Sequence, residues 1–223
     1  MTESIHRPLV EGKMRNYNSV RGAEAYKADH QSKFHRKFSD RKERALLEEY
    51  FDVVGASDTI LDLPCGHGRL SGFLKERCNN LVEGDWSFNM VELNQRDNGR
   101  DGRSYVRCSA LEIPLPDRSI DTVVSFRLSH HLSTPELRER HLQELFRVAR
   151  KAVIVTWFSS SSLKNVLREL RIKLGLAKGS KNTLANARVR EVAQACGFTQ
   201  HTAKPLFVVG SGHVIGLFLR QQG

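Results

Sequence analysis

From about residue 39 onward, the hydrophobic positions of the chain alternate between short apolar runs and stripes at helical spacing. An apolar run bounded by turn residues predicts a buried strand, whereas apolar residues that recur every three or four positions predict an amphipathic helix. Strands are expected at 59–63, 80–85, 104–110, 119–126 and 152–158, with a closing pair of strands near the C-terminus. Helices are expected at 69–78, 87–97, 134–150 and 188–198. This alternation predicts an α/β domain with a mostly parallel sheet, an antiparallel last strand and helices on both faces.

The N-terminal part of the chain has a different pattern. Residues 1–38 are polar, and we predict an arm with one or two short helices that carries Tyr26. This arm is expected to close over the cofactor as a lid, the alternative being a disordered tail. Ser39 is expected to cap the next helix, which has an apolar stripe around Leu47 and ends before Gly55. The predicted organisation is therefore an arm at 1–38 followed by a single domain at 39–223.

Candidate chemistry begins in the stretch 59–73, "TILDLPCGHGRLSGF", where a strand ends in Asp62 and a turn with Gly66 and Gly68 follows. Glycines after a strand indicate that a ligand passes close to the backbone. Asp85, at the end of the next strand, can accept hydrogen bonds from both hydroxyls of a ribose, which fits a nicotinamide dinucleotide and S-adenosylmethionine alike. Asp62 favours S-adenosylmethionine, because a carboxylate there would hold a cationic amino group and repel a pyrophosphate.

Five segments, in this order, resemble the class I S-adenosylmethionine-dependent methyltransferases: "LDLPCGHGR", "EGDWS", "SALEIPLPDRSIDTVVS", "LSHHL" and "ELFRVAR". The resemblance covers residues 39–160 well and the remainder loosely. It implies a Rossmann-like, doubly wound, seven-stranded sheet with S-adenosylmethionine as the cofactor.

The resemblance also implies roles for individual residues. Asp62 and the loop 65–68 would face the methionine end of the cofactor, and Asp85 would bind its ribose. Trp86 would cover one face of the adenine, and Phe126 would line the methyl-transfer channel. The complete implied cofactor site is Asp62, Cys65, Gly66, Gly68, Arg69, Asp85, Trp86, Ser109, Ala110, Leu111 and Phe126.

Two positions depart from the family pattern. Pro64 stands in place of the first glycine of the loop, which removes a backbone N–H. Ser109 stands where an acidic residue usually meets the adenine amino group. Both predict looser cofactor binding, and they leave open a catalytically silent, cofactor-binding partner protein.

The candidate catalytic residues follow the fourth expected strand. Transfer of a methyl group from a sulfonium mainly requires alignment of the acceptor, but a neutral amine or hydroxyl must also lose a proton. His131 or His130 is expected to be the base, the alternative being that one caps the next segment while the other packs. Arg127 is expected to steer an acidic acceptor. The four cysteines are scattered, so we expect reduced thiols, a cytoplasmic location and no metal site.

Charge adds an expectation about the acceptor. Residues 150–223 carry 12 basic and 2 acidic side chains, whereas residues 1–149 carry 23 of each, so the net charge of +10 arises in the last third. Within it, we predict a basic helical insertion at about 159–182. Leu163, Val166, Leu167, Leu170 and Leu174 share one face of this helix, and Lys164, Arg168 and Arg171 lie on the other side. The insertion would cap an anionic acceptor or contact a membrane peripherally, or its apolar face would simply pack on the sheet.

These observations together predict an S-adenosylmethionine-dependent methyltransferase that acts at O or N of a small-molecule or polar-lipid/saccharide acceptor. The alternatives are an RNA methyltransferase, a nicotinamide-dependent oxidoreductase and the silent partner protein. No Asn-Pro-Pro-aromatic tetrad follows the fourth strand, which argues against methylation of exocyclic base amines. No run is apolar and long enough to predict a transmembrane segment.

Overall fold

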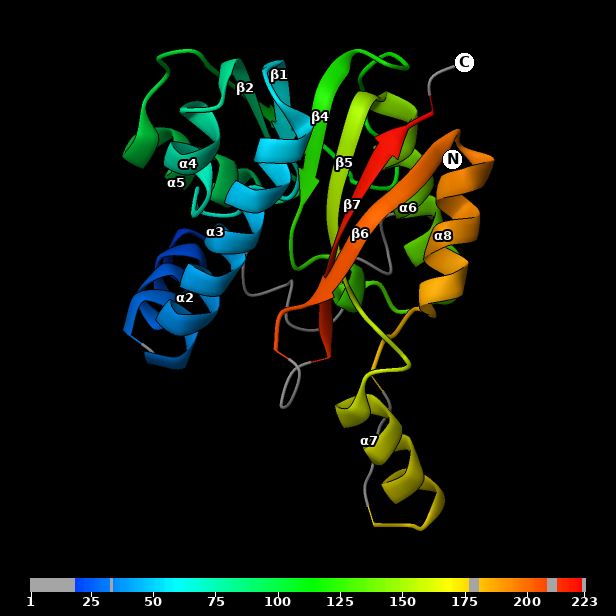
Figure 1. Ribbon diagram of the computed structural model, residues 1–223. Coiled ribbons are helices and arrows are strands. Elements are labelled where there is room, and N and C mark those ends of the chain that lie inside the picture. The colour runs from blue at the N-terminus through cyan, green and yellow to red at the C-terminus, as the bar shows by residue number, and fades with distance from the viewer. Residues whose placement is uncertain (1–18, 33, 177–180, 208–211, 222–223) are drawn as a thin grey trace, which may run out of the picture.

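A computed structural model describes residues 19–32, 34–176, 181–207 and 212–221. Seven strands form one sheet in the order β3-β2-β1-β4-β5-β7-β6 (Figure 1). The strands are β1 Ser57–Asp62, β2 Cys78–Asp85, β3 Arg103–Arg107, β4 Ile120–Ser125, β5 Ala149–Phe158, β6 Phe198–Pro205 and β7 His213–Arg220. Strands β1 to β5 pair in parallel, and β7 is antiparallel to both β5 and β6. The predicted mostly parallel sheet with an antiparallel last strand is confirmed.

Helices cover both faces of this sheet (Figure 1). They are α2 Val20–Ser32, α3 Phe34–Val54, α4 Ser71–Lys75, α5 Phe88–Asn98, α6 Pro135–Val148, α7 Leu163–Lys173 and α8 Asn186–Ala195, and a short 3-10 helix, η2, spans Ser129–His131. Leu47 of α3 and Leu74 of α4 pack with Ile60 in one core, whereas Phe146 of α6 and Val189 of α8 pack in another. Each inner strand therefore buries both its faces, which is why its sequence is a nearly continuous apolar run.

The helix starts follow from local side-chain chemistry. Ser87, Thr134 and Ser162 each accept a hydrogen bond from the backbone amide three residues later, at the starts of α5, α6 and α7. These caps satisfy amides that have no partner inside the helix. At the other end of α3, Gly55 adopts φ +72°, a conformation that glycine reaches without Cβ strain.

Two local predictions were wrong. Ser39 does not cap a helix, because α3 begins at Phe34 and continues through it. Helix α4 spans only Ser71–Lys75 instead of 69–78, and β2 already begins at Cys78. Residues 1–18 of the predicted arm lie outside the described residues. The division into an arm and a domain stays a prediction.

The strand order places the site. The chain runs outward from β1 through β2 to β3, then returns to the other side of β1 with β4 and β5. Ligands bind at such a reversal, beyond the carboxyl ends of the strands. Helix α7 follows the carboxyl end of β5 and extends away from the sheet at that same edge (Figure 1). Among the described residues, no helix is both long and apolar enough to cross a bilayer.

Candidate active site

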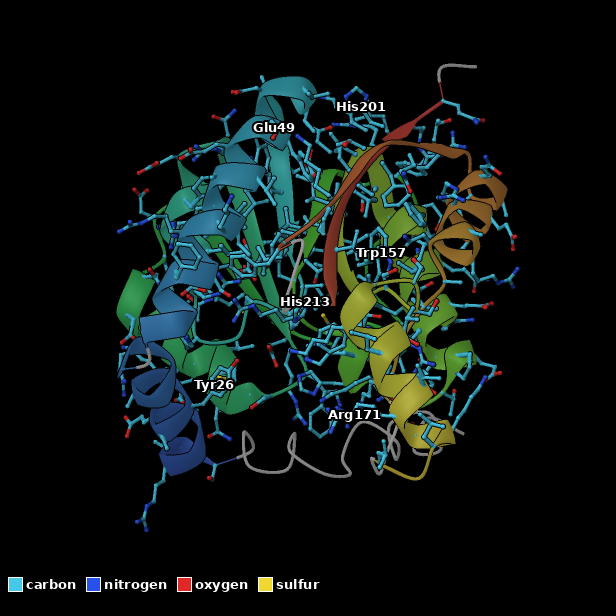
Figure 2. All side chains as sticks on the ribbon, turned by 60° about the horizontal axis from the view of Figure 1, so that its bottom comes forward. Tyr26, Glu49, Trp157, Arg171, His201 and His213 are labelled. Atoms are coloured by element: carbon cyan, nitrogen blue, oxygen red, sulfur yellow. The ribbon has the colours of Figure 1, made fainter. Side chains whose placement is uncertain are left out.

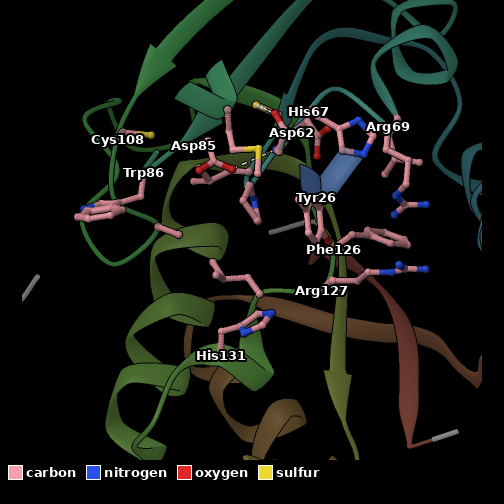
Figure 3. Close-up of a pocket in the computed structure, with 18 of the residues that line it drawn as sticks. Tyr26, Asp62, His67, Arg69, Asp85, Trp86, Cys108, Phe126, Arg127 and His131 are labelled. Carbon is pink, nitrogen blue, oxygen red and sulfur yellow. Dashed lines mark hydrogen bonds between the residues drawn. The ribbon is translucent and has the colours of Figure 1, made fainter. Parts of the chain in front are cut away.

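A cavity opens at the carboxyl ends of β1, β2 and β4, where the strand order reverses (Figure 3). Of the predicted site residues, Asp62, Cys65, Gly66, Arg69, Asp85, Trp86, Ala110, Phe126, Arg127 and His131 line this cavity. Four others, Gly68, Ser109, Leu111 and His130, do not contribute to its wall. Trp86 lies at one end of the cavity and Arg69 at the other, with His131 across from the carboxylates (Figure 3).

Asp62, the last residue of β1, is a buried carboxylate in this wall. Its side chain is 1% exposed, and its Oδ1 atom has no hydrogen-bond partner. Burial, followed by repulsion from Glu83 on the adjacent strand, raises the pKa of Asp62 well above its usual range. A buried carboxylate without a partner is costly, and a cationic donor in the cavity would remove that cost.

Asp85, at the end of β2, holds the glycine loop in place. Its Oδ2 accepts the Gly66 amide at 3.0 Å and its Oδ1 accepts the Ser87 amide at 2.8 Å. Burial raises the pKa of Asp85 to about 6 against the lowering effect of these amides. Each oxygen keeps a second lone pair, so the carboxylate can fix the loop and still accept hydrogen bonds from hydroxyl groups in the cavity.

The two loop glycines differ in what surrounds them. Gly66 lines the cavity at φ +55°, and a Cβ atom there would meet nothing within 4 Å. Gly68 has φ +80°, and its Cβ would collide with the Asn94 and Asn98 side chains of α5. The close approach that requires a glycine at position 68 is therefore made by helix α5.

A second loop forms the wall near Trp86. Ala110 reaches the cavity, whereas the Ser109 hydroxyl accepts the Leu111 amide at 3.2 Å. Leu111 does not line the cavity but packs against Leu132, which does. Behind this loop, His141 Nδ1 lies 3.2 Å from the Ala110 carbonyl and its Nε2 lies 3.2 Å from the Ser125 hydroxyl.

The partners of His141 assign its tautomer. A carbonyl only accepts, so Nδ1 donates to Ala110 and Nε2 accepts from Ser125. Burial lowers the pKa of His141 to about 4, which keeps this neutral form at pH 7. His141 thus ties the Ala110 loop to the end of β4.

Helix α3 joins the site through an ion network that the sequence did not predict. Arg127 Nη2 lies 2.8 Å from Glu43 Oε1 and 3.2 Å from Asp40 Oδ1. Arg69 Nη1 lies 3.1 Å from Asp40 Oδ1 and 2.8 Å from Glu43 Oε2. Glu43 is only 1% exposed, and the guanidinium groups of Arg69 and Arg127 neutralise its buried negative charge. Its position one helical turn before Leu47, on the buried face, was the available signal.

The histidines after β4 take different positions. His131 faces the cavity. The centroid of the His130 ring instead lies 4.6 Å from that of Phe158 and 5.4 Å from that of His213 on β7. Burial lowers the pKa of His130 to about 2 and that of His213 to about 4, so both rings are neutral at pH 7. Among the described residues, no cluster of three or more His, Cys, Asp or Glu side chains could hold a metal ion.

Sequence reasoning did not assign several other wall residues to the cofactor or catalytic sets. Tyr26 of α2, predicted only as part of a lid, lines the cavity with its ring centroid 6.1 Å from that of His67. His67 lies inside the loop 65–68, which was expected to face the methionine end of the cofactor, but it received no role of its own. Met90 and Cys108 carried no comparable signal, because an apolar residue after a strand or in a helix also fits an ordinary core.

Comparison with known proteins gives a family match in the centre of the chain. Residues 61–156 match the family model described as a methyltransferase domain. The chain is 28% identical over 148 residues to the Mus musculus tRNA (carboxymethyluridine(34)-5-O)-methyltransferase ALKBH8, a match that covers 65% of this chain and 21% of that protein. It is 33% identical over 109 residues to the ubiquinone/menaquinone biosynthesis C-methyltransferase UbiE of Xanthomonas oryzae pv. oryzae, covering 44% of this chain and 40% of that protein. The chain thus spans well under half of the length of either relative.

Among solved structures, the fold resembles magnesium protoporphyrin IX methyltransferase (ChlM) from Synechocystis PCC 6803 with bound SAH. The TM-score is 0.75 at 17% identity, over 93% of this chain and 97% of that one. At this level of identity the likeness shows a common fold.

Proposed function

Because residues 61–156 form a methyltransferase domain of the class I S-adenosylmethionine-dependent family, we propose that the protein methylates an oxygen or nitrogen of a small-molecule or polar-lipid/saccharide acceptor. The observation that carries the proposal is the Asp62 carboxylate, buried in the cavity wall with an oxygen that has no partner. The ammonium group of S-adenosylmethionine would supply the missing donor as a charge-assisted hydrogen bond. A pyrophosphate would instead add a negative charge beside Asp62, Glu83 and Asp85.

The rest of the cavity wall fits the other parts of this cofactor. Asp85 would accept the ribose hydroxyls, and Gly66 leaves open space where any other residue would place a Cβ. Trp86, Met90 and Ala110 would enclose the adenine. When bound, S-adenosylmethionine supplies an electrophilic methyl group, so the chain mainly has to bind, orient and exclude water.

The acceptor would enter on the side of Phe126 and His131. We assign the base to His131, because it lies in the cavity wall, whereas His130 lies outside it and, with a pKa of about 2, binds a proton too weakly to serve at neutral pH. Arg127 lies in the wall as well, but its guanidinium is engaged with Glu43 and Asp40. Its role is therefore to position α3, and we do not place it among the groups that steer the acceptor.

Calorimetry with S-adenosylhomocysteine and with NADH tests the cofactor part. We expect saturable heat with S-adenosylhomocysteine and none with NADH, and a reversed result would refute the proposal. For the acceptor, the protein would be incubated with methyl-labelled S-adenosylmethionine and fractionated cell extract. Label in a small-molecule, saccharide or polar-lipid fraction is expected. Binding without label in any fraction would indicate the catalytically silent partner protein.

The base assignment has its own test once a labelled fraction is found. His131→Asn should lower kcat and abolish the acid limb of the pH–rate profile while leaving the Kd of S-adenosylhomocysteine unchanged. His130→Asn serves as the matched control and should keep that limb. An unchanged profile in His131→Asn would remove His131 from the chemistry.

A tRNA acceptor is the second candidate, since relatives from Mus musculus and Xenopus tropicalis are named tRNA methyltransferases. The basic last third of the chain also suits a polyanion. Label that enters the tRNA fraction, and retention of tRNA that weakens steeply with salt, would favour this candidate over the first.

A further inference from the structure

Helix α7 and the residues just after it carry a group of exposed large apolar side chains. Nine large hydrophobic side chains are exposed among the described residues, and five of them lie between positions 166 and 176. Leu170, Leu174 and Leu176 are 52%, 63% and 66% exposed, and Val166 and Leu167 are each 50% exposed. This concentration is unlike the scattered single apolar residues of an ordinary protein surface.

The orientation of α7 explains the exposure. With about 100° per residue, Val166, Leu167, Leu170 and Leu174 form one stripe along the helix. Asn165 projects from roughly the opposite side, where it is buried and donates from Nδ2 to the Ser159 carbonyl at 2.7 Å. The face toward the protein is therefore partly polar and the apolar stripe faces outward. The expectation that this stripe packs on the sheet was wrong.

Basic residues flank the stripe on both sides. At the same angular spacing, Lys164 and Arg171 lie along one border and Lys173 along the other, and Glu169 is the acidic residue of the helix. Long basic side chains beside an apolar stripe can bury their stems while their charges reach a polar headgroup layer. Nucleic acid would satisfy the charges but leave the leucines in water. A second copy of this helix would bring like charges together.

We propose that α7 is an amphipathic anchor that inserts its apolar stripe, residues 166, 167, 170 and 174, into the surface of a bilayer containing anionic lipids. Figure 2 shows α7 with Arg171 and helix α2 with Tyr26 on two sides of the same face, with His213 between them. In this orientation, the carboxyl edge of the sheet and its cavity face the bilayer. Binding to the bilayer does not depend on the proposed methyl transfer.

The test uses the full chain with vesicles of phosphatidylcholine alone and of equal parts phosphatidylglycerol and phosphatidylcholine, followed by flotation. We expect binding to the anionic vesicles that weakens with salt, and much weaker binding to the neutral ones. The double variant Leu167→Gln/Leu170→Gln should lower the partition coefficient about a hundredfold, roughly tenfold for each leucine. Arg171→Gln/Lys173→Gln should lower it about thirtyfold at low salt, roughly fivefold for each charge.

Two matched controls remove similar side chains elsewhere on the surface. Val53→Gln replaces an exposed apolar residue near the end of α3, and Arg190→Gln replaces an exposed basic residue on α8. Both should bind anionic vesicles as the unaltered protein does, and all variants should keep the same melting temperature and S-adenosylhomocysteine affinity. Equal binding to the two vesicle types, or full binding by the leucine variant, would overturn the proposal. Conversion of a dimer to a monomer by the leucine variant in sedimentation velocity would also overturn it, because a second copy would then cover the stripe.

Discussion

Replacing Asp62 with Asn should stabilise the protein and weaken cofactor binding at the same time. The carboxylate is 1% exposed, has an oxygen without a partner, and lies beside Glu83 of the adjacent strand. Asn has nearly the same shape but no charge. Without a ligand, the substitution therefore removes an unfavourable buried charge, and with a ligand it removes the partner of the ammonium group.

The expected magnitudes follow from those two losses. An unsatisfied buried polar group costs about 1–3 kcal/mol, so the unfolding free energy should rise by that amount and the melting temperature by several degrees. Leaving the ligand's ammonium without its carboxylate should cost about 2–4 kcal/mol, which raises the Kd of S-adenosylhomocysteine roughly 30- to 1,000-fold.

The pH dependence of the stability gain has a defined sign. The folded-state pKa of Asp62 is raised, so the unaltered protein takes up a proton on this carboxyl more readily when folded than when unfolded. The gain from Asp62→Asn should be full above the raised folded-state pKa and should shrink as the pH falls through it.

Thermal denaturation and calorimetry on the same preparations measure both effects. Glu83→Gln is the matched control, because Glu83 is fully buried with neither oxygen hydrogen-bonded and does not line the cavity. It should also raise the melting temperature but should not weaken S-adenosylhomocysteine binding. A lower melting temperature with unchanged affinity in Asp62→Asn would refute the reasoning, since Asp62 would then have a purely structural role.

Three further predictions concern the same site. The Kd of S-adenosylhomocysteine should rise up to tenfold for each pH unit below about 6, because Asp85, with its pKa of about 6, then becomes protonated. In calorimetry, Asp85→Asn should flatten this dependence of the Kd on pH, and an unchanged dependence would contradict the assignment of Asp85 to the ribose. Arg127→Gln should lower the unfolding free energy in urea by about 2 kcal/mol, because the buried Glu43 keeps only one of its two guanidinium partners; no loss would show that the network contributes nothing. Gly66→Ala should lower the unfolding free energy by about 1 kcal/mol because of the positive φ at this position, whereas Gly68→Ala should lower it by about 3 kcal/mol because the added Cβ also meets α5. Equal shifts in melting temperature for the two variants would contradict that difference.

The order of strands and helices was readable from the sequence, because each inner strand is a short apolar run and each helix carries an amphipathic stripe. The ends of elements were less predictable. Ser39 has the chemistry of a helix cap, yet α3 passes through it, since tertiary contacts such as those of Asp40 and Glu43 extend the helix. The short α4 shows the same limit, because β2 begins earlier than its apolar run.

The sequence by itself determined which residues end neighbouring strands. Because the carboxyl ends of parallel strands meet at one edge of a sheet, it therefore also determined that Asp62 and Asp85 lie close to the same loop. Only the tertiary structure decided which nearby residues face the cavity. It directed His131 inward and His130 toward Phe158, it engaged Arg127 with Glu43, and it turned the apolar stripe of α7 outward. The physical reason is that residue spacing fixes which side chains share a face of an element, whereas only packing between elements fixes what that face meets.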